Sequence, residues 1–184
     1  MFLSDRDIRD EIEKGNIKIE KGEVANIHPA SNIQPASIDL RLGDNFLMLD
    51  YHKGKGIIRF DEEPDYEKKT GTIILPSLEF VLGTTLEYIS ISPNLVANVQ
   101  GRSSIGRRGL FVQNAGWIDP GFEGNITLEL FNGNRLPIEL KPGIRICQLI
   151  FGYTKTPSEN PYHGKYLGQR GTTGSRSYQD REYS

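Results

Sequence analysis

Apolar and polar residues alternate along much of the chain, with the two-residue period of a half-buried β-strand. The alternation is clear in SIDLRL (37–42), TTLEYISI (84–91) and NITLELF (125–131). Glycine and proline interrupt it at short intervals, for example at Pro93, Gly109 and Pro120-Gly121. Many short strands separated by turns predict a mainly β protein, built as a sandwich or a barrel.

The N-terminus is the exception, because its pattern predicts one short helix over residues 4–14. Ser4 and Asp7 resemble a capping box, Ile8 and Ile12 recur at helical spacing, and Gly15 ends the run.

Two stretches follow neither period. Residues 51–71 are charged and glycine-rich, which favours an exposed loop or a hairpin excursion. From residue 157 onward the chain is again polar and glycine-rich, which is typical either of a disordered end or of a lid that orders on a ligand. We therefore divide the chain into a β domain, residues 1–156, and a C-terminal tail, residues 157–184, that closes over a ligand site.

Composition excludes several classes of protein. The 184 residues fit one domain, and the net charge of −2 gives no basic field for nucleic acid. No apolar run approaches membrane-spanning length and the first residues lack the layout of a signal peptide, so we expect a soluble cytoplasmic protein without membrane partners. One cysteine, Cys147, allows no internal disulfide, and with three scattered histidines it does not supply the ligand pattern of the familiar zinc deaminases.

Candidate chemistry is concentrated in residues 101–132. Arg102, Ser103, Ser104 and Arg107 form a basic turn with two hydroxyls. Guanidinium groups, hydroxyls and backbone N–H groups together suit a polyphosphate, although the same turn also fits a solvated surface.

Glu129 stands in an alternating strand whose other face carries Ile126, Leu128 and Leu130. It is either a solvent-facing carboxylate or a partly buried working group. A second carboxylate, Asp119, lies in a Gly/Pro turn just before the same strand. Paired carboxylates in different environments separate acid and base roles, which favours a functional Glu129.

Three further positions have two interpretations each. Asp39 is a hydrogen-bonded structural residue or a group supporting a metal. Gln148 points at the site or is the polar half of a strand. Cys147 is better explained as a small core residue than as a nucleophile.

Six segments in this order resemble the dCTP deaminase/dUTPase superfamily, and the deaminase branch more than plain dUTPases. They are LSDRDI, QPASIDLRLG, GRSSIGR, AGWIDPGFEGNITLEL, ICQLIF and GKYLGQRGTTGSR, and they cover nearly the whole chain. The resemblance implies a distorted jelly-roll β-fold of the dUTPase type (a β-clip), a homotrimer with sites at subunit interfaces, and a nucleoside triphosphate bound with Mg²⁺. No protein side chain is expected to hold the metal directly.

The resemblance also implies roles for individual residues. Glu129 is implied as the carboxylate of deamination, Ser103 and the carbonyl of Ala115 hold the attacking water, and Arg107 organises the site. The resemblance places Asp119 beside the deoxyribose and implies that it is the base for water attack on the α-phosphate. The remaining nucleotide-binding positions that it implies are Arg102, Ser104, Asn114, Gly116, Trp117, Ile118, Gln148, Tyr162, Lys165, Tyr166, Gln169 and Arg170.

The segment before the IDPG turn bears on whether one reaction occurs or two. Ala115-Gly116 resembles dUTPases and bifunctional enzymes, and glycine lets backbone approach a ligand with positive φ. Asn114 is a departure from the resemblance, because deaminases commonly carry a threonine at this position. We expect dCTP to be deaminated and the resulting dUTP to be hydrolysed to dUMP, with dTTP as a candidate inhibitor. The alternatives are a deaminase that releases dUTP, a dUTPase, a non-catalytic nucleotide sensor and a structural β-sandwich.

Overall fold

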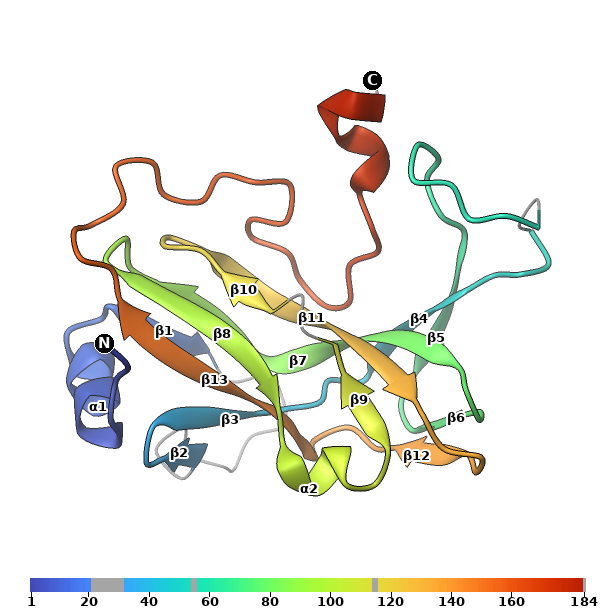
Figure 1. Cartoon of the computed structure of the whole chain (residues 1–184), viewed down its shortest axis with the longest axis horizontal. Coiled ribbons are helices and arrows are strands. Elements are labelled where there is room, and N and C mark those ends of the chain that lie inside the picture. Colours follow the sequence, from blue (N-terminus) through green and yellow to red (C-terminus); the bar gives the residue numbers. More distant parts are fainter. Residues whose placement is uncertain (21–31, 54–55, 114–115, 184) are drawn as a thin grey trace.

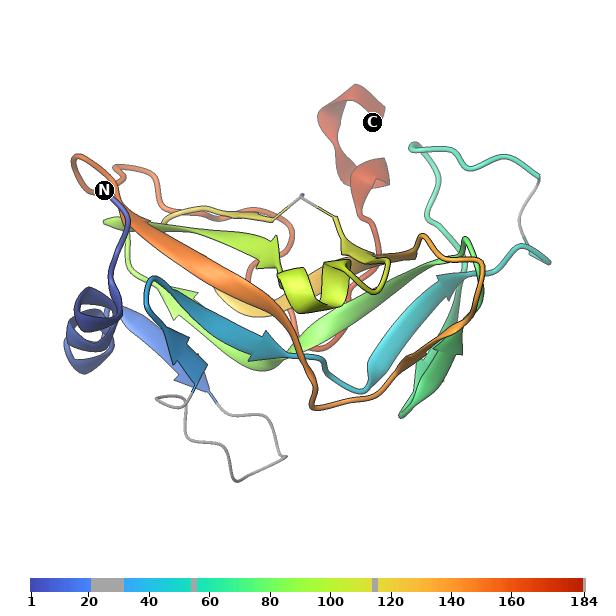
Figure 2. The ribbon, with the colours of Figure 1, turned by 60° about the horizontal axis from the view of Figure 1, so that its bottom comes forward.

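Antiparallel β-sheets make up most of the protein, as the computed structural model shows for residues 1–20, 32–53, 56–113 and 116–183. Figures 1 and 2 show the two larger sheets lying one over the other, with the short helix α1 (Asp5–Glu13) at one end. The expected mainly β class and the single N-terminal helix are both confirmed.

The first sheet has six strands in the order β5-β4-β7-β11-β9, with β1 paired to β7. Its members are β1 (Ile17–Glu20), β4 (Asn45–Leu49), β5 (Tyr66–Thr70), β7 (Phe80–Ile91), β9 (Leu110–Val112) and β11 (Glu123–Asn132). β4 and β5 pair as a hairpin, and the described residues 51–53 and 56–63 of their connection are exposed, as expected for this charged stretch.

The second sheet has five strands in the order β10-β8-β13-β3-β2. Its members are β2 (Ile33–Gln34), β3 (Ser37–Arg41), β8 (Leu95–Gly101), β10 (Trp117–Ile118) and β13 (Arg145–Tyr153). A further pair joins β6 (Ile73–Leu75) to β12 (Ile138–Leu140), and the short helix α2 (Ser103–Gly106) follows β8 directly.

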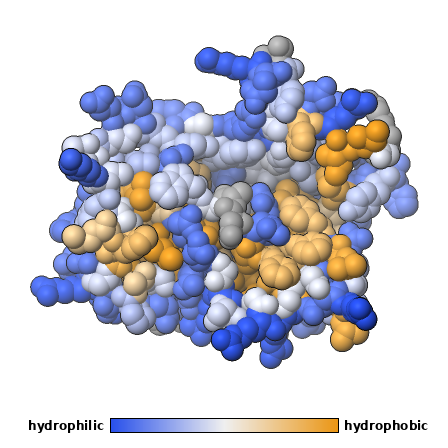
Figure 3. All heavy atoms as spheres, viewed as in Figure 1, coloured by the Kyte–Doolittle hydropathy of each residue, from blue (hydrophilic) through white to orange (hydrophobic). Residues whose placement is uncertain are grey.

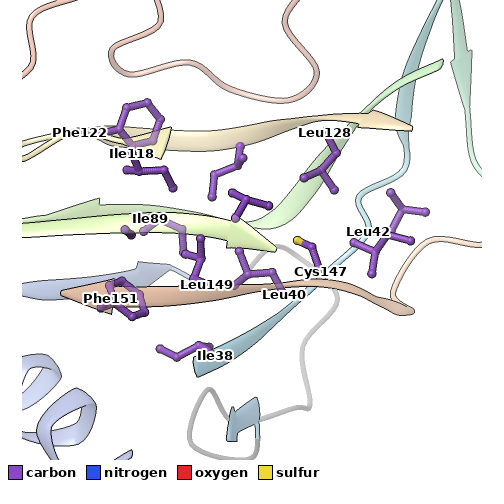
Figure 4. Packing of buried hydrophobic residues seen from close by; sticks show 14 of the residues in the cluster. Ile38, Leu40, Leu42, Ile89, Ile118, Phe122, Leu128, Cys147, Leu149 and Phe151 are labelled. Carbon is purple, nitrogen blue, oxygen red and sulfur yellow. The ribbon is translucent and has the colours of Figure 1, made fainter. Parts of the chain in front are cut away.

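The hydrophobic core lies between the two larger sheets. Ile126, Leu128 and Leu130 of β11 are buried, as the alternation predicts, and they share the core with residues of β13. Figure 4 shows Leu149 and Cys147 directed toward the side of β13 on which β11 lies. Cys147 is therefore the core residue that the sequence suggested, and burial raises the pKa of its thiol.

A buried ion pair ties the two sheets together. The backbone N–H and the Nε of Arg41 on β3 donate to the two carboxylate oxygens of Glu87 on β7, at 2.9 Å and 2.7 Å. The two side chains are only 4% and 5% exposed. Every residue of β3 is buried, so its alternating polar residues point into the protein rather than to solvent.

The helix α1 begins and ends as its sequence predicts. Ser4 is the N-cap, and its capping box with Asp7 satisfies backbone N–H groups that have no partner within the helix. Gly15 takes φ 75° directly after the C-cap residue Lys14, a conformation that glycine adopts without strain. No helix in the described ranges is both long and apolar enough to cross a membrane.

The tail leaves β13 at Tyr153 and runs back across the first sheet (Figure 1). Gln169 forms a parallel bridge with Gly124, at the start of β11. The tail ends in two short 3₁₀ turns, Ser177–Gln179 and Arg181–Tyr183, and the hydroxyl of Ser177 donates to the carbonyl of Phe60 at 2.9 Å. The tail is thus in contact with the β domain along its course, while the division at residue 156 stays a prediction.

Candidate active site

A cavity of about 400 Å³ lies between the first sheet and the tail. The two sheets line it with Phe80, Leu82, Val99, Gly116, Trp117, Ile118, Asp119, Phe122, Ile126, Thr127 and Glu129. The tail supplies Tyr162, Tyr166, Gln169 and residues 173–175, and the β4–β5 hairpin supplies Leu49 and Tyr66. A mainly apolar cavity with a few converging polar groups is typical of a small-molecule site.

Glu129 is placed in this cavity by the alternation of β11. Its neighbours Leu128 and Leu130 face the core, so Glu129 and Thr127 are turned to the opposite face, where the cavity lies. Glu129 pairs with Leu82 of β7 and is half-buried. The carboxylate is therefore set among apolar neighbours and is not a freely solvated surface group.

Asp119 reaches the same cavity from a tight turn. The carbonyl of Asp119 accepts from the N–H of Phe122 at 3.1 Å, and Gly121 takes φ 84°, which together with Pro120 describes a type II turn. The indole Nε1 of Trp117 donates to Oδ1 of Asp119 at 3.0 Å and orients the carboxylate. Two carboxylates on different elements thus line one cavity.

Gly116 is required for a reason that differs from the expected one. It does not take a positive φ, and a Cβ at this position would lie 2.6 Å from the Cβ of Val99 and 2.9 Å from its carbonyl oxygen. The carbonyl of Gly116 accepts from the N–H of Val99 at 2.8 Å. The close approach that the glycine permits is therefore to β8. Asn114 and Ala115, named with it, lie outside the described residues.

The predicted tail residues fall into two groups. Tyr162, Tyr166 and Gln169 line the cavity. Lys165 and Arg170 do not, because each is paired on another side of the tail.

The amine of Lys165 donates to Asp180 at 2.5 Å. The guanidinium of Arg170 lies 3.8 Å from the ring centroid of Tyr88 and 3.4 Å from a carboxylate oxygen of Glu20. Neither cation therefore lines the cavity in this structure.

Gln169 is bound through one end of its amide only. Its Nε2 donates to the carbonyl of Asn125 at 2.7 Å, while its Oε1 is buried without a protein partner. A buried unpaired acceptor is costly, and a donor group on a ligand in the cavity would satisfy it.

The basic turn lies apart from the carboxylates. Ser103, Ser104 and Arg107 are exposed on α2 and at its end, and none of them lines the cavity. Arg102 and Arg145 both reach Oδ2 of Asp39, at 3.3 Å and 3.1 Å.

These contacts bear on two of the open interpretations. Asp39 is buried and serves a structural role, because it anchors the start of α2 through Arg102. Gln148 accepts from the hydroxyl of Ser37 at 3.1 Å and donates to the carbonyl of Gly101 at 3.4 Å, so it too lies outside the cavity. Within one chain, most of the predicted site residues therefore form two separate groups: those that line the cavity, and those on or near α2.

The cavity is acidic within one chain. Among the described residues that line it, Asp119 and Glu129 are the charged ones, and no Lys or Arg is present. The described part of the chain also contains no group of three or more His, Cys, Asp or Glu residues placed to hold a metal ion. The described lining of this cavity therefore supplies no positive charge for a polyphosphate.

Several cavity residues were not identified from the sequence. Thr127 could have been found, because it lies two residues before Glu129 on the same strand face. Tyr66 and Phe80 could not, since no local pattern distinguishes them. They reach the cavity only because β5 and β7 fold around it.

Comparison with known proteins identifies the family. A sequence profile described as dCTP deaminase-like matches residues 2–154. The chain belongs to the dCTP deaminase-like family. Within that family it is 46% identical over 194 residues to a protein of Persephonella marina named dCTP deaminase, dUMP-forming, covering 99% of this chain and 100% of the relative. A protein of Aquifex aeolicus with the same name is 48% identical over 188 residues, covering 99% and 98%.

Solved structures agree on the fold of this dCTP deaminase-like chain. A 2′-deoxycytidine 5′-triphosphate deaminase from Agrobacterium tumefaciens superimposes with a TM-score of 0.61 at 23% identity. The match covers 83% of this chain and 48% of the other, so the chain spans about half the length of that protein. A mutant dUTPase from phage phi11 of S. aureus, whose structure concerns a structural Mg(II) ion, matches with a TM-score of 0.53 at 15% identity, covering 80% and 97%. The expected dUTPase-like β-fold is confirmed.

Proposed function

We propose that this protein is a hydrolase that converts dCTP to dUMP in two steps at one site. The observation that carries the proposal is the presence of two carboxylates, Glu129 and Asp119, in one cavity. It is supported by full-length relatives at 46% and 48% identity whose names describe a dUMP-forming dCTP deaminase.

The first step is deamination. Water attacks C4 of cytosine, N3 receives a proton, and ammonia leaves after a second protonation, so that dCTP and water give dUTP and ammonia. Glu129 carries these protons, because a half-buried carboxylate beside the base can both accept and donate them. Ser103 and the carbonyl of Ala115 orient the water, and Arg107 organises the site.

The second step uses the other carboxylate. A water molecule activated by Asp119 attacks the α-phosphorus of dUTP, the bond to the β-phosphate oxygen breaks, and dUMP and pyrophosphate are released. The hydrogen bond from Trp117 fixes the direction of this carboxylate.

The site is completed by a second copy of the chain. The cavity of one chain has no cation among its described lining residues, while Ser103, Ser104 and Arg107 are exposed on α2 of the same chain, outside that cavity. In a closed homotrimer, α2 and Gln148 of one subunit serve the carboxylates of the next. The phosphates then lie against guanidinium and hydroxyl groups that the acidic cavity lacks.

Exposed apolar residues support such an assembly. Phe111, Ile74 and Leu136 are exposed by 51%, 59% and 74%. Figure 3 shows a hydrophobic area on the right of the face seen in Figure 1. Large exposed apolar areas are typical of interfaces, and burial between subunits would remove this one from water.

Mg²⁺ fits the site as a partner of the triphosphate. Bound with the triphosphate, it would contact phosphate oxygens and keep its waters, so that no protein side chain would need to hold it directly. It would neutralise phosphate charge in a cavity whose charged lining residues are Asp119 and Glu129. The tail closes over the nucleotide through Tyr162, Tyr166 and Gln169, and dTTP, which shares the sugar and triphosphate, is expected to compete for the same site.

Product analysis tests the proposal. The purified protein is given dCTP with Mg²⁺, and separately dUTP, and nucleotides are separated by chromatography while ammonia is measured. We expect equal amounts of dUMP, pyrophosphate and ammonia from dCTP. Accumulation of dUTP as the end product would reject the second step and leave a deaminase alone, and the absence of ammonia would reject the function.

A further inference from the structure

The tail segment 171–176 crosses the cavity without forming a strand, so the partners of its backbone N–H groups decide how it is held. Side-chain oxygens of neighbouring residues accept from four of them. Asn125 accepts from Gly171, Thr127 from Thr173, Tyr66 from Ser175 and Tyr166 from Arg176, at 3.1, 3.1, 3.1 and 3.0 Å.

These acceptors differ in origin. Asn125 and Thr127 belong to β11, the strand that carries Glu129, and Tyr166 belongs to the tail itself. Tyr66 comes from β5, at the edge of the six-stranded sheet, whereas Asp119 lies in the turn that follows β10 of the other sheet. Tyr66 therefore joins the tail to an element that carries neither carboxylate.

Close packing also holds the tail against Tyr66. A Cβ at Gly174 would lie 2.5 Å from the Tyr66 ring, so the tail backbone rests directly on that ring. The hydroxyl of Thr172 donates to the carbonyl of Asn45 on β4, next to β5, at 2.5 Å. The β4–β5 hairpin and the tail thus meet over residues 172–175, and Tyr66 provides both the surface and the hydrogen-bond acceptor.

We propose that Tyr66 is a positioning residue that holds the tail closed over the nucleotide during the two-step reaction. It does not touch the reacting atoms. Its phenol oxygen holds the N–H of Ser175 and its ring supports Gly174, which keeps Tyr166 and Gln169 at the cavity. This inference rests on the proposed function, because the closed tail is what retains dUTP until its hydrolysis.

The consequence is a specific change in products. If the tail opens more readily, dUTP escapes before water attacks the α-phosphorus, while deamination at Glu129 continues. Removal of one neutral hydrogen bond shifts such an opening equilibrium by roughly two- to tenfold.

The test uses Tyr66→Phe, which keeps the ring and removes the acceptor. Tyr51→Phe is the matched control, because Tyr51 lies on the same hairpin, is 66% exposed and does not line the cavity. Gly174→Ala is a second variant that disturbs the packing instead. Hydrogen exchange over residues 171–177 is measured in the unliganded full chain, and KM, kcat and the ratio of dUTP to dUMP are measured with dCTP.

We expect Tyr66→Phe to raise hydrogen exchange in the tail, KM for dCTP and the released fraction of dUTP each by roughly two- to tenfold, with kcat for ammonia release changed less than about twofold. Gly174→Ala should act in the same direction and Tyr51→Phe should match the wild type. Unchanged tail exchange and KM in Tyr66→Phe would overturn the inference. A wild-type protein that forms no ammonia would instead refute the proposed function, and hydrogen exchange would still decide whether Tyr66 holds the tail.

Discussion

Glu129 and Arg107 stand close together in the sequence but lie in separate parts of the folded chain. Glu129 lines the cavity beneath the tail, whereas Arg107 is exposed at the end of α2, outside that cavity. Because of this separation, the described lining of the cavity in one chain carries only negative charge. The proposed reaction therefore needs Arg107 from another subunit of the homotrimer.

The first prediction concerns proton transfer. Glu129→Gln keeps the size of the side chain and removes its ability to accept a proton, so ammonia release from dCTP should fall by at least about a hundredfold. The dissociation constant for dCTP, measured by calorimetry, should change little. Normal turnover in this variant would remove Glu129 from the mechanism.

The second prediction concerns the shared site. Glu129→Gln and Arg107→Ala should each be inactive alone, but trimers refolded from an equal mixture should recover about a quarter of wild-type activity, since each mixed trimer contains about one intact site in three. Ammonia release measures the recovery.

A matched mixture controls for refolding itself. Glu129→Gln mixed with the double variant Glu129→Gln/Arg107→Ala contains no intact site and should stay inactive. No recovery in the first mixture would indicate that each chain builds its own site.

The third prediction concerns the buried ion pair between the sheets. Glu87→Gln removes the carboxylate that accepts from the guanidinium of Arg41 in the core and weakens this charge-assisted contact, which should lower the free energy of unfolding by about 2–3 kcal/mol. Urea denaturation followed by fluorescence measures the change. Glu67→Gln on exposed β5, whose ion pair with Lys69 lies in solvent, is the control and should change stability by less than about 1 kcal/mol.

The fourth prediction concerns Cys147. Burial raises the pKa of its thiol, so in the native protein it should resist thiol reagents that modify an exposed cysteine within minutes, and it should react fully in denaturant. Because the folded state holds this proton more tightly than the unfolded state, the group's contribution to stability is present below the ordinary thiol pKa and falls as pH rises above it. Rapid native labelling would contradict its place in the core.

The local elements could be predicted because neighbouring residues decide them. Ser4, Asp7 and Gly15 define α1 through its caps. The period of two in β11 is enough to turn Glu129 away from Leu128 and Leu130. These features depend on backbone geometry over a few residues, which the sequence specifies directly.

Other features could not be predicted, because they depend on pairing between distant strands. Alternation in β3 does not indicate which residues its polar side chains meet: Arg41 is buried against Glu87 of β7, and the buried Asp39 contacts Arg102 and Arg145 near the ends of β8 and β13. The contacts of Lys165 with Asp180 and of Arg170 with Tyr88 likewise depend on the folded chain, and the roles of these two cations against phosphate stay predictions.

The local sequence is thus sufficient to predict the β class, the caps of α1 and the direction of Glu129 away from the core. It suggests that Asp119 and Glu129 act as a pair, but it leaves open that Thr127 and Tyr66 line their cavity, that Gly116 is needed against Val99, and that Tyr66 contacts the tail, all of which the folded chain reveals. These relationships arise from sheet register and from the path of the tail, because both bring residues far apart in the chain within hydrogen-bonding distance.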